Sequence, residues 1–166
     1  MTNPKQTVKF GDICREVKLT CKDPVAEEYD KYIVLEHLDS GSLKIKRWGS
    51  IAEDNPSFTR VFKKGHILFG KRRPYLKKAA IAEFDGICSS DIIVMEPNEA
   101  LTEPRLLPFI VQSDNFWEWS IKTSSGSLSP RTKFSALKSC DISIPRRLSE
   151  NMILERVAPD GLQKNF

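Results

Sequence analysis

The first stretch of the chain that could do chemistry is residues 65–72, GHILFGKR, which have the Gly, four-residue gap, Gly-Lys spacing of a phosphate-binding loop. In such loops a Ser or Thr follows the lysine and ligates magnesium, whereas Arg72 follows Lys71 here. The four residues of the gap favour an extended, packed strand over a curl of backbone amides. The stretch therefore does not predict a nucleotide-binding enzyme.

Two other patterns are partial matches to catalytic motifs. Residues 55–58, Asn-Pro-Ser-Phe, resemble the Asn-Pro-Pro-aromatic motif of amino-group DNA methyltransferases, but the second proline and a Gly-rich turn for a methyl donor are missing. The nearest set to the carboxylates and lysine of a metal-dependent nuclease is Asp12, Glu16 and Lys18, whose spacing fits one helical surface. Neither pattern predicts a catalytic centre.

The histidines and cysteines are too scattered to form a metal site by spacing. The chain has two histidines, His37 and His66, and no pair of cysteines at C-x-x-C spacing, whereas zinc sites need clustered ligands. A Ser-His or Cys-His nucleophile has no support from spacing either. We therefore expect no metal, no cofactor and reduced thiols, several of them buried. The four cysteines are Cys14, Cys21, Cys88 and Cys140.

The composition is that of an ordinary globular protein. Of the 166 residues, 40% are hydrophobic and 29% are charged, which excludes a disordered chain. No apolar run approaches the roughly 20 residues of a membrane-spanning helix. The polar N-terminus lacks the apolar core of a signal peptide, so we expect a cytoplasmic protein without membrane contact. The length suits one domain.

The positive charge is concentrated, although the net charge is only +4. Between Arg60 and Lys78 there are eight basic side chains and no acid, and a smaller basic group lies beside Trp48. Lys and Arg that replace condensed counterions along a phosphate backbone bind polyanions, whereas a charge run without context is more often a solvated basic face. Here aromatic residues and a rigid turn accompany the charge, which favours nucleic acid.

The elements that would position this charge form a mixed α/β pattern. Residues 65–73 and 79–84 predict a hairpin with a basic tip. The recurrence of apolar residues over 104–122 predicts one amphipathic helix, in which the polar pair Asp114-Asn115 is a point of interruption. We expect a small polar loop from 123 to 131. Further strands are expected at 32–35, 43–46, 92–95 and 141–145, and short helices at 134–139 and 149–158.

In this order the pieces resemble the target recognition domain of the specificity subunit of type I restriction-modification systems. The resemblance covers about residues 8–148, and its long central block is the most specific part. It is carried by residues 10–14 (FGDIC), 32–38 (YIVLEHL), 62–78 (FKKGHILFGKRRPYLKK), 86–94 (GICSSDIIV), 125–127 (SGS) and 141–145 (DISIP).

The resemblance implies a single α+β domain over residues 1–148 with a mixed or antiparallel twisted sheet, a basic hairpin and a few helices. It also implies sequence-specific binding of double-stranded DNA without catalysis. In that family one such domain reads half of a bipartite site, and separate methyltransferase and restriction subunits do the chemistry. A second recognition domain or a homodimer is a further expected partner. The alternative is a degenerate recognition domain that acts as a protein-interaction module.

The expected DNA-binding residues lie on the hairpin tip, on the Ser-Gly-Ser loop and beside Trp48. Their Arg, Lys, Ser and Tyr side chains could reach phosphates and base edges. In order of expectation they are Arg72, Arg73 and Tyr75, then Lys71, Lys77 and Lys78, then Lys44, Lys46, Arg47, Ser127, Arg131 and Lys133.

The C-terminal part departs from the family pattern. Family members follow the recognition domain with a long spacer helix, whereas residues 149–166 predict one short helix and a tail. We therefore expect a stand-alone, half-sized or truncated relative, for which docking to a methyltransferase is open.

Overall fold

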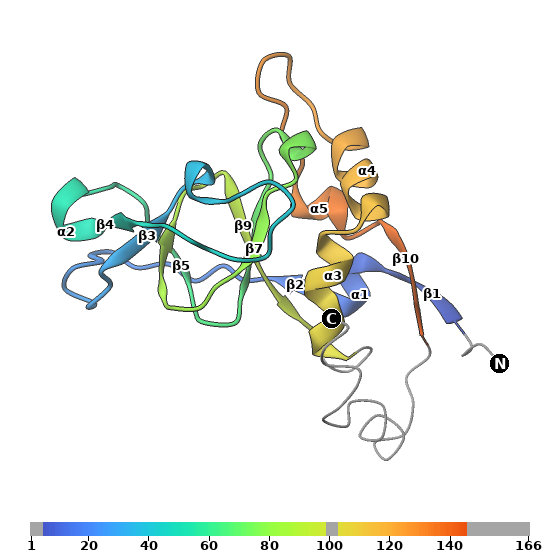
Figure 1. The fold of residues 1–166 in the computed structure, drawn as a ribbon, viewed down its shortest axis with the longest axis horizontal. Helices are drawn as coiled ribbons and strands as arrows, with labels where there is room; N and C mark the ends of the chain where they lie inside the picture. Colours follow the sequence, from blue (N-terminus) through green and yellow to red (C-terminus); the bar gives the residue numbers. More distant parts are fainter. Residues whose placement is uncertain (1–4, 99–102, 146–166) are drawn as a thin grey trace.

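The computed structural model describes residues 5–98 and 103–145, and in this part of the chain ten strands form three β-sheets (Figure 1). Two of the sheets have four strands each, and the third has two. Figure 1 shows them as successive layers, with β3, β4 and β5 at one end of the molecule, β7 and β9 in the middle, and the helices beyond them.

The central sheet has the order β2-β9-β6-β7, and all its neighbouring strands are antiparallel. It joins the predicted hairpin, β6 and β7, to β9, the strand expected at residues 92–95. The strands are β2 (Cys14–Glu16), β6 (Ile67–Gly70), β7 (Ala79–Ile81) and β9 (Ile92–Pro97).

The second sheet has the order β4-β3-β8-β5, in which β3 and β8 are parallel and the other pairs antiparallel. The strands are β3 (Lys31–Ile33), β4 (Gly49–Ser50), β5 (Arg60–Phe62) and β8 (Gly86–Cys88). A short helix, α2 (Ile51–Asp54), follows β4, and Asn55 ends it in the left-handed conformation.

Both faces of the central sheet are covered. Successive strand residues point to opposite faces, so Ile67 and Phe69 pack into the cluster with the helices while Leu68 packs into the cluster with the second sheet. All four residues of β6 are buried as a result. This explains why the stretch reads as an almost continuous apolar run, and its place in a sheet confirms that it is a strand.

Helices form the layer on the other face of the central sheet. Trp117 on α4 stacks on Phe69 of β6, with ring centroids 4.9 Å apart and an angle of 15° between planes. Phe10 and Phe116 extend this aromatic core. The elements of this layer are α1 (Phe10–Ile13), η3 (Pro104–Leu106), α3 (Leu107–Val111), α4 (Asp114–Lys122) and α5 (Phe134–Leu137).

The third sheet joins the two ends of the described chain. β1 (Lys5–Lys9) pairs antiparallel with β10 (Asp141–Pro145), and Lys5 lies opposite Pro145. Two short 3-10 helices lie in loops elsewhere, η1 (Leu35–His37) and η2 (Pro74–Leu76). No helix in the described ranges is long and apolar enough to cross a membrane.

The α+β fold class expected from the sequence is confirmed, with a basic hairpin and a few short helices. The strands expected at 92–95 and 141–145 and the short helix near 134 are also present. The Trp117 side chain lies in the core, as its apolar neighbours indicate.

Other expectations were wrong. Residues 43–46 form no strand. The helix expected over 104–122 is three consecutive helices, and the interruption expected near Asp114 is present at Ser113, which caps α4 through its side chain. Asp12 and Glu16 do not share a helical surface, because α1 ends at Ile13 and β2 begins at Cys14. The helix expected at 149–158 lies outside the described residues.

Candidate nucleic-acid interface

The basic tip of the hairpin is the loop between β6 and β7. Pro74 begins the single turn of η2, and Arg73 and Lys77 on either side of it take the left-handed conformation, with φ of 51° and 54°. Non-glycine residues avoid this region unless their surroundings hold them there. The tip is therefore a fixed turn, and its shape is set by what packs against it.

The loop with the Ser-Gly-Ser sequence packs against that tip through backbone hydrogen bonds. The Arg73 amide donates to the Pro130 carbonyl (2.7 Å), and the Thr132 amide donates to the Lys71 carbonyl (3.1 Å). Ser125 and Arg131 close the loop by exchanging hydrogen bonds of 3.0 and 2.9 Å. Figure 1 shows the loop and η2 projecting on the same side of the molecule. Segments about 60 residues apart in the sequence thus form one surface.

One carboxylate connects the two basic segments. Asp91, in the turn between β8 and β9, lies 2.9 Å from Arg131 Nε through Oδ1 and 3.5 Å from Arg72 Nε through Oδ2. The second contact is an ion pair without hydrogen-bond alignment, so Arg72 Nε has no hydrogen-bond partner. The Asp91 side chain is only 19% exposed. It holds both guanidinium groups at the junction of tip and loop.

Two large side chains project from this surface into solvent. Leu128, in the Ser-Gly-Ser loop, is 86% exposed, and Tyr75, on the tip, is 50% exposed. Apolar side chains of this kind contact thymine methyl groups or wedge between base steps in DNA complexes. Sequence reasoning missed Leu128, although it is the one large apolar residue in an otherwise small and polar loop.

Not every basic residue of the tip is available to a ligand. Lys78 Nζ donates to the Leu35 carbonyl (3.0 Å), and Arg73 Nη2 donates to Ser129 Oγ (3.3 Å) while its Nε is buried. These two side chains therefore hold the tip to its neighbours. Lys77 is more exposed, with Asp114 Oδ1 4.0 Å from its ammonium group. Of the remaining candidates, Ser127 and Lys133 are exposed, and Lys71 is half-buried.

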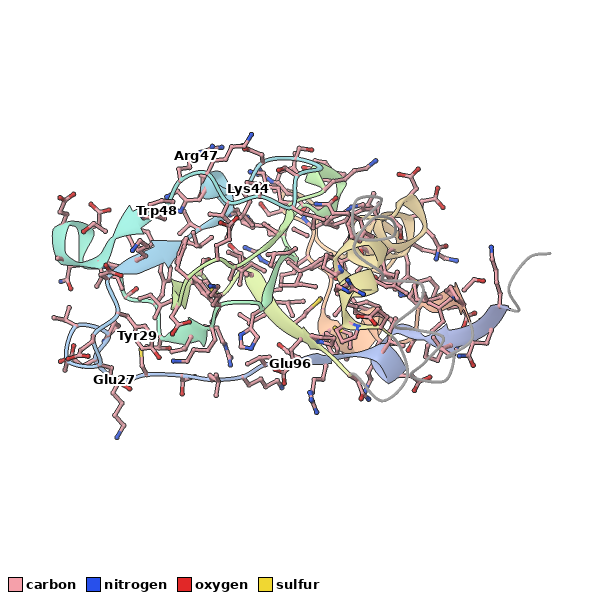
Figure 2. The ribbon with its side chains drawn as sticks, turned by 60° about the horizontal axis from the view of Figure 1, so that its bottom comes forward. Glu27, Tyr29, Lys44, Arg47, Trp48 and Glu96 are labelled. Atoms are coloured by element: carbon pink, nitrogen blue, oxygen red, sulfur yellow. The ribbon has the colours of Figure 1, made fainter. Side chains whose placement is uncertain are left out.

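The third basic group lies on the loop that runs beside β7. The Gly41 amide donates to the Lys77 carbonyl (2.8 Å), and the Ile81 amide donates to the Leu43 carbonyl (2.9 Å), so this loop continues the surface away from the tip. Figure 2 shows Lys44, Arg47 and Trp48 along one edge of the molecule, with Glu27, Tyr29 and Glu96 along the opposite edge.

The charges on this loop are partly paired. Lys44 lies 2.9 Å from Glu83, Arg47 pairs with Asp39, and Lys46 is exposed. The hydrogen bond from Arg47 lowers the pKa of Asp39 from its ordinary value. Surface pairs of this kind contribute little and can be exchanged for phosphate contacts. The loop can therefore contribute charge at the margin of the surface.

The histidines and cysteines, which could act as bases or nucleophiles, are hydrogen-bonded to the backbone or buried in the fold. His37 Nδ1 accepts the Val34 amide and His66 Nδ1 accepts the Lys63 amide, both at 3.0 Å. All four cysteines are free and buried, and burial raises the pKa of Cys88 to about 12, so this thiol is protonated at neutral pH. Among the described residues, no three His, Cys, Asp or Glu side chains gather as a metal site.

Comparison with known proteins confirms the resemblance, seen in the sequence, to the target recognition domain of type I specificity subunits. The specificity subunit of the type I restriction enzyme EcoDI from Escherichia coli is 26% identical over 151 residues, or 90% of this chain and 33% of that protein. No protein-family model matches the chain.

Solved structures share the fold. A chain from a structure of a type I R-M system, concerned with complex assembly and conformational transition, has a TM-score of 0.72 at 23% identity over 95% of this chain and 42% of that one. The HsdS subunit from Thermoanaerobacter tengcongensis has a TM-score of 0.69 at 24% identity, over 92% and 41%. The chain thus spans about a third to two fifths of the length of these relatives.

Proposed function

We propose that the chain binds duplex DNA and reads its sequence, as a non-catalytic specificity component of a type I restriction-modification system. The observation that carries this proposal is the joining of the hairpin tip to the Ser-Gly-Ser loop, with Asp91 between Arg72 and Arg131. The joined segments present basic groups around two exposed large side chains, Tyr75 and Leu128. Phosphate contacts position a protein on DNA, and groups that reach base edges give it sequence preference.

The side chains divide into three roles in this proposal. Lys71, Lys77 and Lys133 contact phosphates, together with Lys44, Lys46 and Arg47 at the margin. Arg72, Arg131, Tyr75, Ser127 and Leu128 face the grooves, because they lie at or beside the junction of tip and loop. Arg73 and Lys78 support the tip from beneath, since their polar atoms bond to Ser129 and Leu35.

The partners follow from the resemblance to type I specificity subunits. In that family one recognition domain reads half of a bipartite site, so we infer that this domain works with a second recognition domain. Methylation and cleavage of DNA then belong to separate methyltransferase and restriction subunits. We place this work in the cytoplasm.

The first test is the salt dependence of binding to a labelled duplex. If about six phosphates are contacted, affinity should fall about 10^3-fold between 50 and 200 mM salt. Lys77→Gln should lower the salt slope by about one, because it removes one phosphate contact. Lys5→Gln, on β1, removes the same charge outside the surface and should leave the slope unchanged. A flat salt response in the unmodified protein would sink the proposal.

The second test separates base contacts from phosphate contacts. Selection from a random duplex pool should enrich one motif, and Leu128→Ala should weaken binding to that motif about tenfold without changing the salt slope, since Leu128 is uncharged. Val25→Ala removes another exposed apolar side chain, outside this surface, and serves as the control. Salt-sensitive binding without an enriched motif would exclude sequence reading, and no binding at 50 mM salt would favour the protein-interaction alternative.

A further inference from the structure

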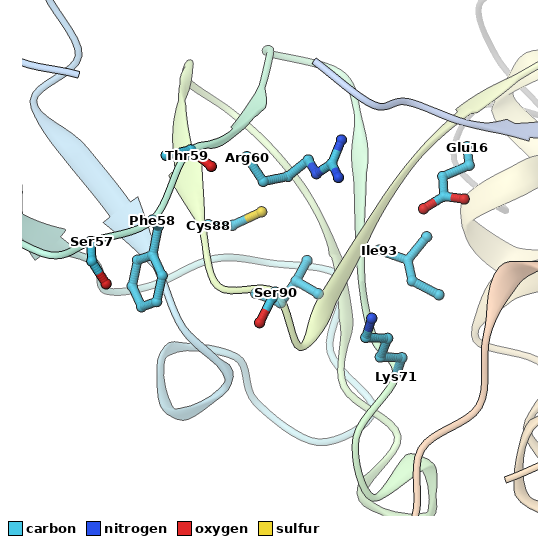
Figure 3. A pocket seen from close by; sticks show the side chains of 10 residues that line it. Glu16, Ser57, Phe58, Thr59, Arg60, Lys71, Cys88, Ser90 and Ile93 are labelled. Atoms are coloured by element: carbon cyan, nitrogen blue, oxygen red, sulfur yellow. The ribbon is translucent and has the colours of Figure 1, made fainter. Parts of the chain in front are cut away.

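A polar pocket of about 390 Å³ lies between the two four-stranded sheets, beside the base of the hairpin tip (Figure 3). Its volume falls in the range of small-molecule sites. Its walls come from β2, β5, β8 and β9, and its rim from the loop before β5 and the turn after β8. The lining residues are Glu16, Ser57, Phe58, Thr59, Arg60, Lys71, Cys88, Ser90, Ile92 and Ile93.

The first unexplained group in this pocket is the guanidinium of Arg60. Arg60 lies on β5 opposite Cys88 of β8, and the side chains of such a pair project to the same face of a sheet. Arg60 Nη1 is buried without a hydrogen-bond partner, and no carboxylate of the described residues lies within ion-pair distance of the side chain. Buried cationic N–H groups without an acceptor are costly. Arg60 is thus a cation of the pocket lining that has no counter-charge among the described residues.

The second group is the ammonium of Lys71. Within residues 5–98 and 103–145 it has neither a hydrogen-bond nor an ion-pair partner, although its residue is half-buried. Figure 3 shows Arg60, on β5, on one side of the pocket and Lys71, which directly follows β6, on another. Ser57, Thr59 and Ser90 add hydroxyl groups that can donate to the same ligand.

The only acid of the lining is Glu16, whose carboxylate lies 3.9 Å from Lys18 outside the lining. Two unpaired cations and one carboxylate leave the lining positive, which excludes a metal cation as its occupant. Arginine and lysine with several hydroxyls are the donors that recognise a tetrahedral phosphate. The apolar wall of Cys88, Ile92 and Ile93 would exclude water and strengthen those contacts.

We propose that this pocket binds a phosphate group, held by Arg60 and Lys71. The phosphate can belong to the DNA backbone, because Lys71 and Ser90 are the direct neighbours of Arg72 and Asp91, or to a free nucleotide. This inference goes beyond the DNA-binding function, since phosphate binding here stands even if the tip and loop bind no duplex.

The test follows the Arg60 Nε–H signal by NMR during titration with inorganic phosphate. We expect a saturable shift of that signal and of the Ser90 amide, and loss of both shifts in Arg60→Gln. Lys71→Gln should weaken phosphate binding about tenfold. It tests the proposal independently if Arg60→Gln does not fold. Lys5→Gln should titrate like the unmodified protein.

Titration with inorganic phosphate, in the absence and in the presence of saturating duplex DNA, distinguishes the two sources. If DNA supplies the phosphate, saturating duplex abolishes the response of Arg60 to inorganic phosphate, and if a nucleotide supplies it, the response persists on duplex-saturated protein. Phosphate shifts confined to Arg72, Arg131 and other exposed basic residues, with Arg60 unmoved, would overturn the proposal.

Discussion

Asp91 connects the hairpin tip and the Ser-Gly-Ser loop in the proposed DNA-binding surface. Its carboxylate accepts from Arg131 and lies beside Arg72, while its carbonyl accepts the Lys71 amide at 3.0 Å. In the free protein it occupies the place of an anion between two guanidinium groups. A DNA phosphate that approaches them must compete with it, which favours duplexes that add base contacts as well.

Asp91→Asn should therefore raise affinity for unrelated duplex DNA and lower the preference for the selected motif. The change removes one negative charge and frees two arginines, but it also loosens the junction of tip and loop. The measurement is the ratio of dissociation constants for the selected and a scrambled duplex, which we expect to fall about tenfold. Glu53→Gln, on α2, removes the same charge elsewhere and should leave the ratio unchanged. An unaltered ratio in Asp91→Asn would assign Asp91 to folding alone.

His37 should make stability depend on pH. Burial lowers its pKa, and Arg47 adds to the effect while Glu36 opposes it. The folded protein therefore binds this proton less readily than the unfolded chain, whose pKa is about 6.5. Stability is fully present above that value and is lost as the pH falls toward the lower folded pKa.

The measurement is the free energy of unfolding by urea at pH 7.5 and at pH 5.0. His37→Asn keeps an acceptor for the Val34 amide and does not titrate, so its loss of stability over this interval should be smaller than that of the unmodified protein. Equal losses in the two proteins would show that the His37 pKa is not lowered.

At the scale of elements, the break between α3 and α4 positions the helix that packs beside the tip. Ser113 Oγ accepts the Phe116 amide at 3.3 Å and so caps α4. Gln112 in the same break donates to the carbonyls of Lys77 and Ala79, at 3.4 and 2.8 Å. The start of α4 is thereby fixed to the second strand of the hairpin.

Ser113→Ala should lower the free energy of unfolding by about 1 kcal/mol, the usual cost of losing a helix cap. Urea denaturation monitored by circular dichroism measures it. Ser139→Ala, at an exposed serine, is the control and should be neutral. A neutral Ser113→Ala would mean that water replaces the cap.

The elements that could be predicted are those whose burial leaves a pattern. Residues 67–70 are apolar throughout because both faces of β6 are buried, and residues 92–95 are similar. β1 was missed because Lys-Gln-Thr-Val-Lys is polar and pairs with β10 through its backbone. Residues 43–46 alternate like a strand, yet only the Leu43 carbonyl joins β7.

The sequence predicts which basic residues belong to the site, but not which side chains they contact. The sequence indicates that Arg72 and Arg131 lie beside turns. The carboxylate that both contact, that of Asp91, comes from a third segment. Lys78 looks equivalent to Lys77 in sequence, whereas its ammonium bonds to Leu35. Such pairings depend on contacts between distant segments, which no local spacing encodes.

For the whole molecule, the two large apolar clusters share β6 and β9, and this coupling should make unfolding cooperative. Leu68 is fully buried between the two four-stranded sheets, while Ile67 and Phe69 beside it face the helices. Leu68→Ala should cost about 2–5 kcal/mol, as large-to-small changes in a core do. Lost packing on one face of β6 should destabilise the apolar clusters on both faces.

The measurement compares urea unfolding followed by backbone circular dichroism with that followed by fluorescence of Trp117, which reports on the helical side, in protein that carries Trp48→Phe and Trp119→Phe. The two curves should coincide in Leu68→Ala and shift together to lower urea. Val25→Ala, at an exposed position, should not shift either curve. Separate midpoints would show that the two clusters unfold independently.

The pairing of β1 with β10 has an evolutionary consequence. Because Lys5 lies opposite Pro145, the polypeptide enters and leaves this fold at adjacent points of one small sheet. A unit with neighbouring entry and exit points can be duplicated, or exchanged between genes, as a cassette without disturbing what flanks it. Under the proposed function, such an exchange would carry the hairpin tip and the Ser-Gly-Ser loop together as one unit.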